Sequence, residues 1–195
     1  MLSVVIATEN AERILGQTLA ALVPGAMAGL VSEVILADAG SRDATAVIAE
    51  SVGCRIEVAA APLGHRLKHA AAGARGAWLL FLRPGLVLDS TWPEEASRFI
   101  QASELGATAS ARAAAFRPPG EAESFAAMLA EGVALIIAAL GGRPRPQQGL
   151  LISKSLYERL GGHRGEDADP ETSLLRRLGR RRIVLLRSRT MLVAG

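Results

Sequence analysis

The chain has 195 residues, of which half are hydrophobic and only 4% are aromatic, and its net charge is +3. A chain of this length is expected to form a single domain with a full hydrophobic core. The single cysteine excludes an intrachain disulfide, and Met1 leads into an apolar segment with no basic leader before it. We therefore expect a cytoplasmic protein.

Positive charge is concentrated in the last quarter of the chain. Residues 141–195 hold 12 Lys and Arg against 5 Asp and Glu, and much of this excess lies in Arg176, Arg177 and Arg180–Arg182. One interpretation is a solvated helix end, because cations are favoured at helix C-termini. The other is contact with anionic lipid or with a phosphorylated substrate. Nucleic acid is not expected as a partner, since no binding motif or aromatic platform accompanies the arginines.

In chain order, the first half alternates short apolar runs with segments of helical spacing. The expected strands lie at 3–6, 34–36, 54–58 and 78–82, and the expected helices at about 11–22, 43–53, 65–75 and after Pro93. A weakly alternating stretch from Thr108 to Phe116 resembles an edge strand. Continuous apolar runs such as 79–82 are typical of strands buried on both faces. The fold class is therefore α/β, with a mainly parallel sheet flanked by helices.

Polar residues follow these strands at the points where they end. Thr8 and Asn10 follow the first strand, Asp38 ends the second, and Arg83 follows the strand at 78–82. In an open parallel sheet the ligand lies beyond the carboxyl ends of the strands. The sequence thus predicts a site at this edge, with one acidic strand end and one basic strand end.

The stretch 125–140 is apolar apart from Glu131 and is followed by two glycines. Its 16 residues are fewer than the roughly 20 that a membrane-spanning helix needs. Two interpretations stay open, a buried helix and a helix that lies in the interface of a lipid bilayer. The second would make the protein peripheral at the inner face of the membrane.

Five segments, in order, resemble family-2 glycosyltransferases of the GT-A fold, in particular the small bacterial members. The segments are Ser3–Asn10 (SVVIATEN), Glu33–Thr45 (EVILADAGSRDAT), Ala74–Leu82 (ARGAWLLFL), Gln148–Gly162 (QGLLISKSLYERLGG) and Leu174–Arg180 (LLRRLGR). The resemblance implies a nucleotide-binding half over residues 1–105 and an acceptor-side half over residues 106–195. It also implies transfer of a sugar from a nucleotide-diphosphate donor to an acceptor hydroxyl.

The resemblance assigns roles to residues near the strand ends. By position Asp38 matches the carboxylate that recognises the nucleoside, with Thr8 and Asn10 as its neighbours. The alternative for Asp38 is an ordinary turn residue that accepts hydrogen bonds from its own backbone. In the family a Mg²⁺ or Mn²⁺ ion held by a short Asp motif neutralises the diphosphate, and an Asp or Glu takes the proton from the acceptor hydroxyl.

Three of the family motifs are altered in this chain. Pro146-Gln147-Gln148 stands where the family tends to carry Gly-Asp-Gln, and the other two changes concern the metal and the base. Arg83-Pro84-Gly85 stands where the family carries its metal-binding acid, so that Gly85 replaces the carboxylate and no metal cofactor is expected. Pro170-Glu171 stands where an acidic pair supplies the base, which leaves Glu171, with Asp167 as the substitute. The acidic loop before it can also be simply solvated, with Asp169 capping the helix that starts at Pro170.

Two accounts fit these losses. In the first, Arg83 together with Arg66 and Lys68 of the preceding helix replaces the metal, because guanidinium groups neutralise phosphate oxygens directly. Arg66 and Lys68 can equally be exposed helix residues. In the second account the site has decayed, and the chain is an inactive homologue that serves as a binding or scaffolding module.

Overall fold

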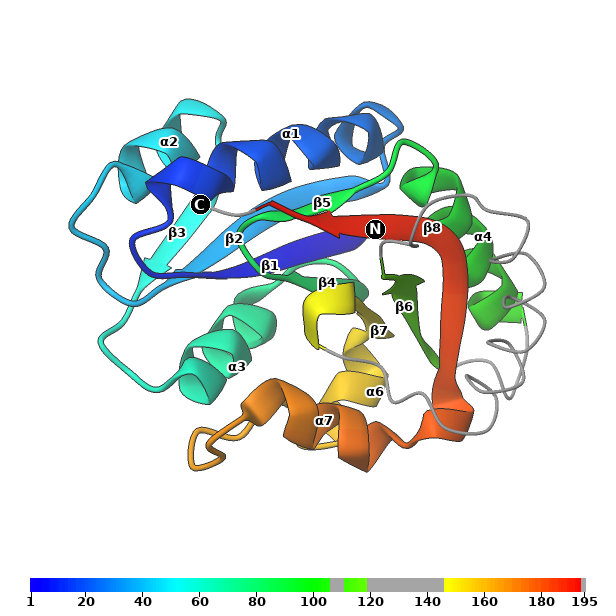
Figure 1. Cartoon of the computed structure of the whole chain (residues 1–195). Helices are drawn as coiled ribbons and strands as arrows, with labels where there is room; N and C mark the ends of the chain where they lie inside the picture. Colours follow the sequence, from blue (N-terminus) through cyan, green and yellow to red (C-terminus); the bar gives the residue numbers. More distant parts are fainter. Residues whose placement is uncertain (106–110, 119–145, 194–195) are drawn as a thin grey trace, which may run out of the picture.

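The computed structural model describes residues 1–105, 111–118 and 146–193. These residues form a curled, eight-stranded sheet in the order β3-β2-β1-β4-β7-β6-β8-β5, with helices on both faces (Figure 1). Four neighbouring pairs are parallel and three are antiparallel. The α/β class with a mostly parallel sheet, predicted from the sequence, is confirmed.

The strands at the parallel end of the sheet match the predicted ones closely. They are β1 (Leu2–Thr8), β2 (Val31–Asp38), β3 (Arg55–Val58) and β4 (Trp78–Leu82). All four run in the same direction, so their carboxyl ends meet at one edge of the sheet. The remaining strands are β5 (Leu86–Leu88), β6 (Ala113–Arg117), β7 (Leu150–Ser153) and β8 (Ile183–Leu192).

The helices cover the sheet in two layers (Figure 1). Helices α1 (Glu12–Met27), α2 (Thr45–Ser51) and α4 (Trp92–Leu105) lie on one side, and α3 (Leu63–Gly73), α6 (Lys154–Arg159) and α7 (Pro170–Leu178) lie on the other. Two short 3-10 turns, η2 (Pro146–Gln148) and η3 (Arg180–Arg182), precede β7 and β8. The predicted positions of the first four helices are confirmed to within a few residues, except that α1 extends to Met27.

Alternation along β1 shows why both faces are covered. Val4 and Ile6 belong to the core cluster under α1, with Leu15 and Leu19, whereas Val5 belongs to the cluster under α3. Each of these buried aliphatic side chains contributes about 1.5–3 kcal/mol through removal of apolar surface from water. Because successive apolar residues of β1 point to opposite faces of the sheet, each face needs a helix layer to cover it.

The predicted edge strand is the main correction to the sequence interpretation. β6 lies inside the sheet, paired with β7 on one side and with β8 on the other, and Ala113–Phe116 are buried. Its outer partner β8 was not predicted, and because β8 is far along the chain, local alternation in β6 gave no sign of it. Residues 106–110 and the apolar stretch 125–140 lie outside the described residues. Within the parts of the chain that the structure describes, no helix is long and apolar enough to cross a membrane.

Candidate functional site

The carboxyl ends of β1 and β2 are joined by their last residues. Thr8 and Asp38 are partners in the parallel register, and the Thr8 hydroxyl donates a hydrogen bond of 2.7 Å to Asp38 Oδ1. Both side chains are buried. The structure thus places these two predicted site residues side by side, at the edge where the sequence predicted a site.

The Asp38 carboxylate accepts four hydrogen bonds, three of them from the turn that follows it. Its Oδ2 accepts from the backbone N–H groups of Gly40 and Ser41, and its Oδ1 accepts from the Ser41 hydroxyl as well as from Thr8. Burial raises the pKa of Asp38, but these hydrogen bonds outweigh it and hold the pKa below its ordinary value of 3.8. The carboxylate therefore stabilises the turn after β2, as the alternative interpretation of Asp38 expected. It also lies at the sheet edge where the sequence predicted a site.

Asn10 connects the loops that follow β1 and β2. Its backbone N–H donates to the Ser41 hydroxyl at 2.9 Å, and its Oδ1 accepts from the Arg42 N–H at 2.9 Å. The residue adopts a positive φ of 48°, which asparagine tolerates better than most residues. The two loops border an open hollow of about 560 Å³, lined by Asn10–Ile14, Arg42 and Asp43.

Arg66 is buried, which differs from the exposed position that was one interpretation of it. Its guanidinium donates to the carbonyls of Thr8 (3.1 Å), Ala37 (2.6 Å) and Ala61 (3.1 Å). It thereby ties the ends of β1 and β2 to the loop before α3. Lys68 is exposed on α3 and makes no hydrogen bond or ion pair with any described residue.

The end of β4 is tied to the first turn of α7 by an ion pair between Arg83 and Glu171 (88 residues apart in the sequence). Arg83 Nε donates to Glu171 Oε2 at 2.8 Å, and Nη2 donates to the same oxygen. This hydrogen bond raises the pKa of Arg83. The candidate base and the candidate phosphate-binding cation are therefore paired with each other.

Helix α7 begins as the sequence predicted. Asp169 accepts a hydrogen bond of 3.1 Å from the Thr172 N–H, and Pro170 occupies the first turn. Asp167, the second acidic candidate, is half-buried in the preceding loop, and its Oδ2 has no hydrogen-bond partner. Glu171 is thus held by Arg83 through one oxygen, Oε2, and Asp167 lies in the loop before it without an ion pair to Arg83.

A buried histidine near Glu171 had not been predicted to belong to the site. His163 and Glu171 line the same small cavity, and the His163 ring packs edge-on against Phe81 with centroids 4.7 Å apart. The Tyr157 hydroxyl accepts a hydrogen bond of 3.0 Å from the backbone N–H of His163 and lies 2.9 Å from Nδ1 of the His163 ring. Burial, with a smaller contribution from the Arg177 charge, lowers the pKa of His163 to about 3. The imidazole is therefore neutral at physiological pH.

Comparison with known proteins decides the family. The model of the family "Glycosyl transferase family 2" matches residues 3–138. The chain belongs to glycosyl transferase family 2. No curated protein sequence matches it significantly.

The fold of this family 2 chain is that of GT-A glycosyltransferases. Glucosyl-3-phosphoglycerate synthase from Mycobacterium tuberculosis, in complex with Mn²⁺, UDP and glucosyl-3-phosphoglycerate, aligns with a TM-score of 0.69 and 19% identity over 100% of this chain and 72% of that one. S. aureus TarS in complex with UDP aligns with a TM-score of 0.69 and 15% identity, over 96% of this chain and 59% of that one. At these identities the likeness concerns the fold.

The residues at the end of β4 do not fit the divalent ion that the family fold implies. Gly85 has no side chain, and a Cβ added there would lie 3.0 Å from the Val193 carbonyl. Asp89 already accepts hydrogen bonds from Thr91 and from the Arg189 N–H, and Glu171 is bound by Arg83. No group of three or more His, Cys, Asp or Glu residues suited to a metal occurs in the described part of the chain.

Proposed function

We propose that this family 2 chain binds a nucleotide-diphosphate sugar at the carboxyl ends of β1, β2 and β4. The observation that carries the proposal is the hollow between the first two loops, which Asn10 lines, next to the buried Thr8–Asp38 pair at the ends of β1 and β2. In this proposal the nucleoside lies in that hollow and the diphosphate extends toward β4. The presence of UDP in the two similar structures supports the choice of ligand.

Cations take the place of the metal in this proposal. The Arg83 side chain is 37% exposed, so that its guanidinium can reach both Glu171 and solvent, and Lys68 is exposed on α3. Guanidinium groups bind phosphate oxygens through charge-assisted hydrogen bonds. Arg66 contributes differently, because its Nη1 donates to the strand-end carbonyls of Thr8 and Ala37 and its Nε donates to the Ala61 carbonyl. It positions the β1 and β2 ends, and its positive charge favours an anion nearby.

Transfer requires that the Arg83–Glu171 pair open. When the diphosphate takes the Arg83 guanidinium, the Glu171 carboxylate becomes available to an acceptor hydroxyl. The hydroxyl then gives its proton to Glu171, its oxygen bonds to the anomeric carbon, and the bond from that carbon to the diphosphate oxygen breaks. The nucleoside diphosphate leaves with its charge neutralised by Arg83. Asp167 is the second candidate for the base.

A binding module without turnover is the second candidate function. The Arg83–Glu171 pair favours it, because transfer requires that this pair open, and two hydrogen bonds from one guanidinium hold it closed. The loss of the metal-binding acid at Gly85 points the same way. In this case the chain binds the donor, or a molecule like it, and the pair between Arg83 and Glu171 of α7 stays intact.

Calorimetric titration with UDP-, GDP- and dTDP-sugars, with and without manganese, tests the proposal. Binding that is unchanged by manganese supports the cation site, and binding that requires manganese contradicts it. Absence of binding to every nucleotide sugar contradicts donor binding altogether. A transfer or donor-hydrolysis assay on the same samples then separates the enzyme from the binding module.

A further inference from the structure

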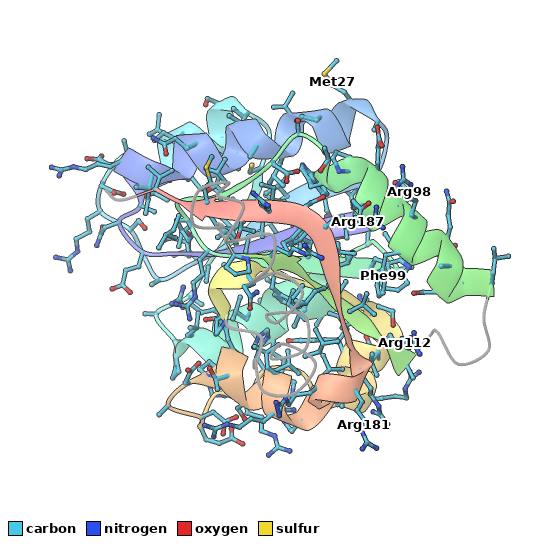
Figure 2. The ribbon with its side chains drawn as sticks, turned by 45° about the vertical axis from the view of Figure 1, so that its right-hand side comes forward. Met27, Arg98, Phe99, Arg112, Arg181 and Arg187 are labelled. Atoms are coloured by element: carbon cyan, nitrogen blue, oxygen red, sulfur yellow. The ribbon has the colours of Figure 1, made fainter. Side chains whose placement is uncertain are left out.

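Four exposed arginines form a cluster at the far edge of the sheet from the nucleotide site. They are Arg112, which precedes β6, and Arg180–Arg182, which form η3 and precede β8. We call this cluster the arginine patch. The parallel register pairs Ala113 with Ile183, so that Arg112 and Arg182 directly precede paired residues of adjacent strands. Figure 2 shows Arg112 and Arg181 at the same end of β8.

The patch lies at the amino ends of its strands. β6 is antiparallel to β7, β7 is antiparallel to β4, and β8 is parallel to β6. β6 and β8 therefore run in the direction of β4, and their amino ends face away from the edge that holds Thr8, Asp38 and Arg83. A phosphorylated substrate bound at the nucleotide site is consequently not the partner of the patch.

The arginines of the patch have no carboxylate partner among the described residues, in contrast to two surface arginines, Arg75 and Arg98. Arg98 pairs with Glu94 and Glu95 on α4, and Arg75 pairs with Glu33. Among the described residues, none forms an ion pair or a side-chain hydrogen bond with Arg112 or Arg180–Arg182. Within the described residues, no carboxylate therefore neutralises these four charges, which lie at one edge of the sheet.

A helix C-terminus does not explain the patch. α7 ends at Leu178, and Gly179 at a φ of 78° turns the chain away before Arg180. Arg180–Arg182 therefore lie beyond the helix, in η3. Arg177, which is within α7, donates to the Leu160 and Gly162 carbonyls instead. The charge of the patch serves no contact within the described fold.

The neighbouring surface favours lipid over single-stranded nucleic acid. Nucleic-acid platforms use exposed aromatic rings on which bases stack. None of the large hydrophobic side chains exposed in the described residues is aromatic. Instead the aliphatic Leu185 follows the patch on β8 and is 39% exposed. Cationic groups beside an aliphatic side chain suit the phosphate layer of a bilayer, where each Arg near the surface strengthens binding about fivefold.

We propose that the arginine patch docks the protein on an anionic lipid bilayer. The phosphates and anionic headgroups neutralise Arg112 and Arg180–Arg182, while the carboxyl ends of the strands, at the opposite edge of the sheet, stay open to solvent. This inference is independent of which donor the site binds. It also assigns a role to the basic segment that the proposed function leaves without one.

Sedimentation of the full chain with vesicles tests the inference. The vesicles contain phosphatidylcholine alone or phosphatidylcholine with phosphatidylglycerol, at low and at high salt. We expect binding only to the anionic vesicles, weakened by salt. In the triple variant Arg180→Gln, Arg181→Gln, Arg182→Gln, the partition coefficient should fall on the order of a hundredfold.

A matched variant removes the same amount of charge elsewhere. In Arg75→Gln, Arg98→Gln, Arg164→Gln the partition coefficient should stay within a few-fold of the parent, because these exposed arginines lie outside the patch. Thermal denaturation of both variants checks that they are folded. An equal loss in both, equal binding to neutral vesicles, or binding to single-stranded RNA without binding to anionic vesicles would overturn the inference.

Discussion

Arg83 at the end of β4 and Glu171 in the first turn of α7 meet through a single carboxylate oxygen, which accepts hydrogen bonds from both Nε and Nη2. The pair joins the carboxyl end of β4 to the first turn of α7. It also brings together the two charged groups on which donor binding and proton transfer depend in the proposed function. Separating them is therefore the first test of that function.

In Glu171→Gln the Arg83 guanidinium loses its counter-ion and becomes free for the diphosphate. We expect donor affinity to rise. In Arg83→Gln we expect donor affinity to fall about tenfold to a hundredfold, which corresponds to one charge-assisted hydrogen bond. Titration calorimetry measures both. The control is Arg98→Gln, which lies on α4 and should bind donor as the parent does. Equal affinity of the parent and Arg83→Gln would exclude Arg83 from the phosphate site.

The same Glu171→Gln variant distinguishes an enzyme from a binding module. If Glu171 is the base, the rate of transfer should fall about a hundredfold to ten-thousandfold although donor binding improves. Asp167→Asn should leave the rate nearly unchanged. The opposite pattern, with only Asp167→Asn slowed, would move the base to Asp167. A parent chain without activity toward any donor, but with measurable binding, would identify the module.

Asp38 makes the free energy of unfolding depend on pH in the acid range. Asn at this position places an amide NH₂ near the N–H groups of Gly40 and Ser41, so Asp38→Asn should lower the free energy of unfolding by about 1–3 kcal/mol at neutral pH. The pKa of Asp38 is lowered in the folded state, so this contribution is present above 3.8 and is lost as pH falls through the lower, folded-state pKa. Urea denaturation should show the two proteins converging below that pH. A constant difference would contradict the account.

The buried His163 gives a second pH dependence, over a higher range. The unfolded chain binds a proton near pH 6.5, whereas folded His163 does so only at about 3. The free energy of unfolding should therefore decrease as pH falls from 6.5 toward 3, by up to about 1.4 kcal/mol per pH unit. His163→Asn should flatten this slope. His69→Asn, at an exposed position, should keep it, and a slope that His163→Asn leaves unchanged would refute the assignment.

Local signals predicted the parallel half of the fold and the edge at which Thr8 and Asp38 meet. The strand ends at Thr8 and Asp38 and the cap at Asp169 each depend on a few neighbouring residues, so pattern and residue type were sufficient. The Arg83–Glu171 pair, the burial of Arg66 and the place of β6 inside the sheet depend on segments that are distant in the sequence. No local period encodes such partners, and a charged residue in α3 gave no sign that it would be turned toward strand-end carbonyls.

Helix α3 lies in close contact with the loop before α7, which carries His163 and Asp167. A Cβ added at Gly64 would lie 2.0 Å from the Arg164 carbonyl oxygen, which is a backbone atom and not the end of a flexible side chain. Gly64→Ala should therefore push the loop that carries His163 and Asp167 away from α3, and lower the free energy of unfolding by about 1–3 kcal/mol. Gly16→Ala is the matched control, because no atom lies within 4 Å of a Cβ there. In the middle of α1 it should stabilise the protein by about 0.5–1 kcal/mol. Chemical denaturation measures both changes, and equal stability of the two variants would show that the close approach at Gly64 relaxes without cost.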